Sequence, residues 1–202
     1  MKGFWQKLLQ PTSNRFVTIV SGLPRSGTSM MMKMLEAGGI PPLTDELRTA
    51  DKDNPRGYYE FERVKKLDEG DTAWLEDAQG SAVKVISALL KHLPPDYPYK
   101  VIFMDRKIEE VLASQRQMLI RRGESPDSVS DEKMMGLFGK HLEQVQAWLN
   151  EQPNVDVAYV SYNGILESPR EQAERINQFL GHVLDVEKMV EVVDEALYRQ
   201  RR

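Results

Sequence analysis

The sequence contains no cysteine among its 202 residues. That absence excludes disulfide bridges, thiolate metal sites, iron–sulfur clusters and cysteine nucleophiles. A chain without disulfides also suits a reducing compartment, so we expect a cytoplasmic protein. No apolar run approaches the length that crosses a membrane, and no export signal is visible. Phe4, Trp5, Leu8 and Leu9 predict a small amphipathic helix that docks on the domain, with a membrane anchor as the alternative.

An excess of positive charge is lacking as well. Lys and Arg number 27 against 31 Asp and Glu, which gives a formal net charge of -4. Such a chain has no general attraction to nucleic acid or anionic lipid, so we expect no nucleic-acid partner and only local basic sites. Apolar residues make up 41% of the chain, as in globular proteins. Nothing in the sequence predicts an oligomeric state.

Predicted strands alternate with predicted helices along the chain. Short β-branched or apolar runs predict strands over 16–20, 82–86, 101–104 and 155–160. Apolar periodicity and helix-stop residues predict helices over 30–37, 60–69, 89–93, 107–122, 131–151, 168–180 and 186–198. This order predicts an α/β fold, a mostly parallel sheet of about four to five strands flanked by helices. Without a repeat or a composition break, we expect a single domain over 1–202.

A glycine-containing loop joins the first predicted strand to the first predicted helix. Gly22 and Gly27 have the spacing of the phosphate-binding P-loop, in which backbone amides and a helix N-terminus face the anion. Thr28, however, stands where that motif has its lysine, and Arg25 is the one cation inside the loop. Kinases and NTPases use the lysine to contact the outer phosphates. The loop is therefore either a degenerate relic or the cradle of a different phosphate.

In its P-R-S-G-T-S form the segment 23–29 resembles the 5′-phosphosulfate loop of sulfotransferases. These enzymes use 3′-phosphoadenosine 5′-phosphosulfate (PAPS) as cosubstrate, and the resemblance implies a P-loop fold similar to that of nucleotide kinases. It implies that Arg25 neutralises the leaving phosphate and the sulfuryl oxygens, an electrostatic role that suits a permanently charged arginine. It also implies that the 5′-phosphate is held by the amides of Ser26, Gly27, Thr28 and Ser29.

Two further segments resemble the same family, in the family's order. Arg106 follows the third predicted strand and Ser114 comes eight residues later on a helix, which resembles the site that binds the 3′-phosphate. Tyr162 begins a block similar to the family's Y-E-D-L…F-L-G, although Asn163 and Gly164 replace the acidic pair. The resemblance places Tyr162 near the adenine. Packing of this tyrosine on the core is the alternative.

The resemblance implies transfer of a sulfuryl group to a hydroxyl or amine acceptor without a metal. Cytosolic sulfotransferases carry K-T-H-L-P after the second strand, with the histidine as base. Here Lys84 is retained and expected to contact the bridging oxygen, while Ile86 occupies the histidine's position. Glu60, in a segment similar to the N-P-x-G-Y-x-E of bacterial members, is the predicted general base, and Glu62 is the fallback. A glutamate that merely favours a helix N-terminus is the alternative for Glu60.

Two other functions compete with this one. The strand 101–104 followed by Asp105 is typical of a Walker B strand that ends in a magnesium-binding aspartate, which favours a P-loop kinase or NTPase. The missing histidine leaves room for a non-catalytic nucleotide-binding module. For the sulfotransferase, we expect a small-molecule acceptor, an alcohol on a metabolite, sugar or lipid, bound by segments near 40–60 and 122–140.

Overall fold

The structure is a computed structural model that describes residues 16–45, 57–124 and 130–193. The predicted amphipathic helix around Phe4 and Trp5 lies outside the described residues. So do much of the segment near 40–60 that is expected to bind the acceptor and the last residues of the helix predicted over 186–198.

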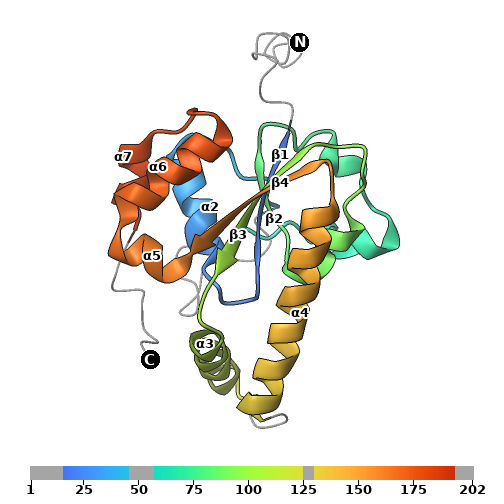
Figure 1. The fold of residues 1–202 in the computed structure, drawn as a ribbon, viewed down its shortest axis with the longest axis vertical. Helices are drawn as coiled ribbons and strands as arrows, with labels where there is room; N and C mark the ends of the chain where they lie inside the picture. Colours follow the sequence, from blue (N-terminus) through green and yellow to red (C-terminus); the bar gives the residue numbers. More distant parts are fainter. Residues whose placement is uncertain (1–15, 46–56, 125–129, 194–202) are drawn as a thin grey trace.

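Four parallel strands form the central sheet, in the order β2-β1-β3-β4 (Figure 1). Their bounds are Val17–Gly22 for β1, Ala82–Lys84 for β2, Tyr99–Asp105 for β3 and Val155–Ser161 for β4. In the register of the sheet Val20 pairs with Lys84 on one side and with Ile102 on the other. The strand order reverses direction at β1, and ligands of open α/β sheets bind at such a point, beyond the carboxyl ends of the strands.

Helices cover both faces of this sheet (Figure 1). One face carries α2, Thr28–Ala37, together with α5, Tyr162–Glu167, α6, Pro169–Leu180, and α7, Val186–Glu191. The other face carries α4, Asp131–Glu151, and the 3-10 helices η1, Glu62–Glu69, η2, Ala73–Leu75, and η3, Ser87–His92. Helix α3, Ile108–Arg121, follows β3 and lies beyond the carboxyl edge of the sheet, alongside α4. The predicted parallel α/β architecture is confirmed.

Some predicted elements differ in kind or length. The segments predicted as helices over 60–69 and 89–93 are 3-10 helices, and the first of them ends at Gly70 in the left-handed conformation. Helix α7 ends at Glu191 rather than at residue 198. Helix α5 was not predicted. It begins because the Ser161 hydroxyl caps it by accepting a hydrogen bond from the Gly164 amide at 3.1 Å.

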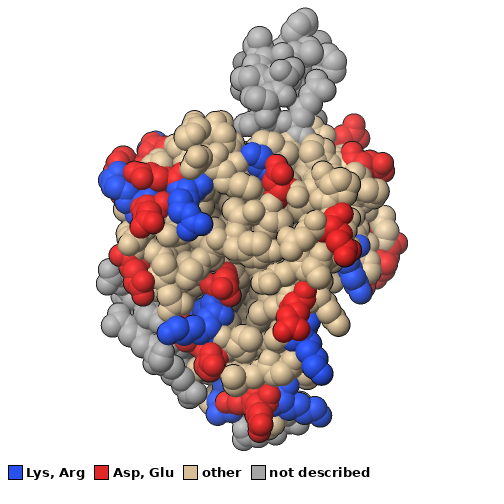
Figure 2. Space-filling model, viewed as in Figure 1, with Lys and Arg blue, Asp and Glu red and all other residues tan. Residues whose placement is uncertain are grey.

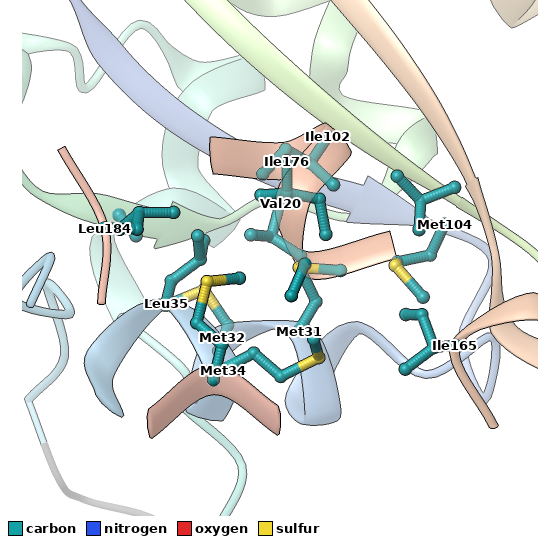
Figure 3. Packing of buried hydrophobic residues seen from close by; sticks show 14 of the residues in the cluster. Val20, Met31, Met32, Met34, Leu35, Ile102, Met104, Ile165, Ile176 and Leu184 are labelled. Atoms are coloured by element: carbon teal, nitrogen blue, oxygen red, sulfur yellow. The ribbon is translucent and has the colours of Figure 1, made fainter. Parts of the chain in front are cut away.

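The sheet separates two apolar clusters. Between the sheet and α2, α5, α6 and α7, the fully buried Met31, Met32 and Met34 pack around Val20 and Ile102 (Figure 3). On the other face, η1, η2 and η3 contribute the buried residues Leu67, Trp74 and Leu90. The central strand β1 is buried along its whole length. The loop that follows β1 therefore leaves a rigid part of the molecule.

The contact between α2 and α7 predicts a stability effect. A Cβ on Gly38 would lie 2.9 Å from Met189 Cγ and 3.2 Å from Leu184 Cδ2. We expect Gly38→Ala to lower the free energy of unfolding by about 1–3 kcal/mol, because the side chain would overpack this contact. Urea denaturation measures the change.

Gly136→Ala is the matched control, because a Cβ at this position of α4 meets nothing within 4 Å. It should raise the free energy of unfolding by about 0.5–1 kcal/mol through helix propensity. Equal effects of the two substitutions would contradict the close packing of α7 on Gly38.

Candidate active site

The loop between β1 and α2 has a backbone that only glycine can adopt at two positions. Gly22 has a φ of 145° and Gly27 a φ of 100°. A Cβ on Gly22 would lie 2.7 Å from the Met104 carbonyl oxygen, and a Cβ on Gly27 would overlap the Tyr162 ring. Gly27 is also the N-cap of α2, and no side chain caps this helix. The first amides of α2 and its dipole therefore face the loop, as in a phosphate cradle.

Two residues of this loop are unusual, Arg25 in its backbone conformation and Ser26 in its buried hydroxyl group. Arg25 has a φ of 73°, and its Nε donates a hydrogen bond to Ser114 Oγ at 3.0 Å. Ser26 is 1% exposed, and its Oγ has no hydrogen-bond partner in the part of the chain that the structure describes. A buried hydroxyl without a partner and a strained arginine are features of a ligand site. The cradle therefore fits a phosphate group.

A buried network fixes Arg106 at the end of β3. Its Nε donates to Glu110 Oε2 at 3.0 Å and its Nη1 donates to the Arg25 carbonyl at 3.1 Å. The two side chains of this ion pair are 7% and 0% exposed. Asn163 Nδ2 donates to the other oxygen of Glu110 at 3.2 Å, and the guanidinium carbon of Arg106 lies 4.2 Å from the centre of the Tyr162 ring. Arg106 is thus oriented from three sides.

Glu110 and the role of Asn163 were missed from the sequence. Glu110 lies four residues after Arg106, and that spacing is a signal of an ion pair on a helix face. Asn163, noted only as a departure from the family block, supplies the second hydrogen bond to this buried carboxylate. The predicted partners Arg106 and Ser114 line one cavity, but the hydrogen bond of Ser114 comes from Arg25.

Tyr162 is 6% exposed and belongs both to the core and to the wall of the cavity. Burial raises the pKa of its phenol, while the positive charges of Arg106 and Arg25 act to lower it. The net direction is upward, so the hydroxyl stays protonated at neutral pH. The ring offers an uncharged surface beside two arginines.

Lys84 brings a cation to the phosphate loop from the neighbouring strand. Its Nζ lies 3.4 Å from Ser29 Oγ and also donates to the Tyr58 carbonyl. Lys84 ends β2, which pairs with β1 beside the loop. The loop has Thr28 where the P-loop motif has its lysine, and a lysine from another strand, Lys84, lies beside the loop.

The two predicted base candidates lie in different surroundings. Glu60 lines the cavity, its side chain is 21% exposed, and its Oε2 is 3.6 Å from Lys65 Nζ. Glu62 is 44% exposed and forms an ion pair with the same lysine at 2.6 Å. Glu62 is not among the described residues that line the cavity. Glu60 therefore shares the wall of one cavity with Lys84 and the loop, and Glu62 is not among the described residues of that wall.

The cavity has a volume of about 500 Å³ and lies at the carboxyl ends of β1, β2 and β3, between η1, η3 and α3. Nine predicted site residues line the cavity: Arg25, Gly27, Thr28, Ser29, Glu60, Lys84, Arg106, Ser114 and Tyr162. Ser26, which is buried in the loop, is not among the described lining residues. Asp105, the aspartate of the kinase alternative, is exposed and is not among the described lining residues.

Basic side chains gather inside this cavity. Six of its described lining residues are basic and one, Glu60, is acidic. On the face drawn in Figure 2, in contrast, acidic and basic side chains are interspersed. The local excess of positive charge suits an anionic ligand even though the chain as a whole has a net charge of -4.

The parallel sheet, the glycine loop after its first strand and the cavity at its carboxyl edge define an α/β protein of the P-loop class. The family model described as "Sulfotransferase domain" matches residues 17–202. The chain belongs to the sulfotransferase domain family, as the loop predicted. A search of the curated proteins found no match to it.

Solved sulfotransferase structures have a similar fold. STF1 from Mycobacterium tuberculosis matches with a TM-score of 0.56 at 15% identity, over 98% of this chain and 80% of that one. STF9 from Mycobacterium avium matches with a TM-score of 0.52 at 15% identity, over 100% and 72%. A sulfotransferase domain from the curacin biosynthetic pathway matches with a TM-score of 0.51 at 15% identity, over 89% and 78%. These structures confirm the predicted P-loop nucleotide-kinase-like fold.

Two features are absent from residues 16–45, 57–124 and 130–193. No group of three or more His, Asp and Glu side chains in these ranges could hold a metal ion. No helix within them is long and apolar enough to cross a membrane.

The buried pair of Arg106 and Glu110 predicts a large stability effect. We expect Glu110→Ala to lower the free energy of unfolding by about 3–5 kcal/mol, because it leaves a guanidinium that is 7% exposed without its carboxylate. Urea denaturation followed by circular dichroism measures this change.

Glu187→Ala provides the control. Glu187 is paired with Arg170 at 2.5 Å, but both side chains of that pair are exposed. Exposed pairs contribute little, so this variant should unfold close to wild type. A Glu110→Ala variant as stable as Glu187→Ala would show that the Arg106 network is accessible to water.

Proposed function

We propose that this protein transfers a sulfuryl group from PAPS to the hydroxyl, or amine, of a small-molecule acceptor without a metal. The observation that carries the proposal is one cavity that holds the phosphate loop, Lys84 and Glu60 together. Family membership supports the reaction class.

The donor's 5′-phosphate is assigned to the loop. Amides of Ser26–Ser29 and the dipole of α2 would bind the anion, and the unpartnered Ser26 hydroxyl lies in the same cradle. Gly27 is required there because a side chain would meet Tyr162. Ser114 and Arg106 would contact the 3′-phosphate, and Tyr162 the adenine. The network with Glu110 and Asn163 keeps Arg106 oriented before any nucleotide arrives.

The reaction is a displacement at sulfur. The acceptor oxygen forms a new bond to sulfur while the bond between sulfur and the 5′-phosphate oxygen breaks, and the electron pair leaves with the nucleotide as 3′-phosphoadenosine 5′-phosphate (PAP). Arg25 and Lys84 would stabilise the charge that develops between the two oxygens, because both line the loop end of the cavity. Their positions are fixed by Ser114 and Ser29, so little reorganisation is needed during transfer.

The proton of the acceptor hydroxyl requires a base. Glu60 is the one carboxylate among the described lining residues. Its Oε2 forms an ion pair with Lys65 Nζ at 3.6 Å. The proton of the acceptor would pass to this carboxylate as the bond to sulfur forms. No histidine is needed in this arrangement.

Donor binding is tested by calorimetric titration with PAP in the absence of metal. Wild type should bind, and Arg25→Gln should bind more weakly by about 1.5–3 kcal/mol, because a charged hydrogen-bonding group is lost. Arg63→Gln is the control, since Arg63 pairs with Asp71 and is not among the described residues of the cavity wall. Wild type that fails to bind PAP, or an Arg25→Gln variant that binds it as well as wild type does, would contradict the donor assignment.

The base is tested with an alcohol that accepts sulfate from radiolabelled PAPS in a screen of small hydroxyl compounds. Glu60→Gln should lower kcat by about 10²–10⁴-fold, the range for loss of a general base, while PAP affinity is retained. Glu62→Gln makes the same charge change two residues away, outside the described cavity wall, and should leave kcat near wild type. If Glu62→Gln lowers kcat and Glu60→Gln does not, the assignment is reversed.

A further inference from the structure

Tyr59 lies directly before the proposed base in a backbone conformation that side chains rarely adopt. Its φ of 51° places it in the left-handed region, although it is not a glycine. A bulky residue is unfavourable there and keeps this conformation only where surrounding contacts hold it, which happens most often at functional sites. Tyr58 and Glu60 line the cavity on either side, whereas Tyr59 is not among the described lining residues. Contact with a ligand in the cavity therefore does not account for its strained backbone.

The side chain of Tyr59 lies instead against helix α2. Its hydroxyl donates a hydrogen bond to Glu36 Oε2 at 2.7 Å, and Lys33 Nζ donates to the same oxygen at 2.9 Å. Burial acts to raise the pKa of Glu36, but the hydrogen bonds from Lys33 and Tyr59 lower it, and the net direction is downward. Glu36 is therefore a carboxylate at neutral pH. A hydroxyl that donates to a carboxylate makes one of the stronger kinds of hydrogen bond.

The main chain on both sides of this tyrosine is also held by hydrogen bonds. Lys84 Nζ donates to the Tyr58 carbonyl. The Glu60 carbonyl accepts a hydrogen bond from Thr44 Oγ1 at 2.8 Å and one from the Asp45 amide at 3.4 Å. These bonds restrain the peptide groups before and after the strained residue. The φ between them sets the direction in which the Glu60 side chain leaves the backbone.

Helix α2 connects this segment to the site assigned to the donor. It begins at Thr28, in the phosphate loop, and Glu36 lies in its last turn. The helix is packed firmly on the sheet, since Met31 and Leu35 are fully buried. A group that is hydrogen-bonded to Glu36 therefore keeps a constant position relative to the loop. Such constancy matters for in-line transfer, because a misplacement of about 1 Å can lower the rate by a factor of 10².

We infer that Tyr59 is a positioning residue of the reaction, whose hydroxyl bond to Glu36 holds the strained backbone that directs the Glu60 carboxylate into the cavity. Tyr59 acts through Glu60 and touches neither donor nor acceptor. Without the hydroxyl bond the left-handed φ relaxes and the carboxylate moves, while the phosphate loop keeps its shape. The inference rests on the proposed function and names the residue that holds its base in place.

The test removes the hydroxyl and keeps the ring. For Tyr59→Phe, kcat is measured with PAPS and the alcohol found in the acceptor screen, and we expect it to fall by about 10–100-fold. The donor KM and the Kd of PAP should stay unchanged, because the loop is intact. Tyr99→Phe is the matched control. Its hydroxyl donates to the Pro94 carbonyl at 3.0 Å in the cluster on the other face of the sheet, outside the described cavity wall, so kcat should stay near wild type.

Two double variants separate positioning from general structural damage. In the Glu60→Gln background the carboxylate is already gone, so adding Tyr59→Phe should lower kcat no further, as for residues that act as a unit. Glu36→Leu removes the acceptor of the hydroxyl bond and should lower kcat to the level of Tyr59→Phe. Combining these two substitutions should add nothing, because both break the same contact. Thermal melting of each variant verifies that the chain is folded.

Three results would overturn the inference. They are a Tyr59→Phe variant with the kcat of Tyr99→Phe, a fall in kcat that is equally large in the Glu60→Gln background, and a loss of PAP affinity in Tyr59→Phe. Failure of the proposed function shows itself before Tyr59 is changed. Wild type that transfers no sulfuryl group, or a Glu60→Gln variant as active as wild type, removes the reaction or its base and the assignment of Tyr59 with it.

Discussion

The close approach of the β1–α2 loop to Tyr162 is the constraint on which the site depends. It is possible because Gly27 has no side chain and adopts a positive φ. Tyr162 in turn supports the guanidinium of Arg106, and Arg106 donates to the carbonyl of Arg25. Arg25 then reaches Ser114 on α3. One glycine thus connects the loop to α5, β3 and α3, and a larger residue there would displace each of them.

The buried charges at this site are balanced by partners that lie next to them. Arg106 is stable in the interior because Glu110 and Asn163 satisfy the charge and hydrogen bonds of the pair. The cavity as a whole is basic although the chain is acidic. Buried partners fix the orientation of Arg106 at the cavity wall.

The sequence predicted the fold well because its signals are local. Strand β1 is a β-branched run, the loop is marked by Gly22 and Gly27, and α6 has Pro169 at its start and Gly181 at its end. Nine of the predicted site residues line the cavity, and they belong to motifs of fixed spacing. Contacts between distant segments were not. Arg25 meets Ser114 across 89 residues and Lys84 meets Ser29 across 55, and neither pairing follows from periodicity. The different surroundings of Glu60 and Glu62 depend on how η1 lies against the cavity, which a short 3-10 segment does not reveal.

The phosphate cradle also has a consequence for folding. Its parts come from β1, β3, α3 and α5, and the carbonyl of Met104 must lie against Gly22 for the loop to adopt its shape. The cradle is therefore absent from an unfolded chain, and an anion that binds it binds the folded chain alone. Each tenfold excess of such a ligand over its Kd adds about 1.4 kcal/mol to the free energy of unfolding. With the proposed nucleotide as that ligand, the chain would be more resistant to heat and proteolysis in a cell that is rich in the nucleotide than in one that is depleted of it.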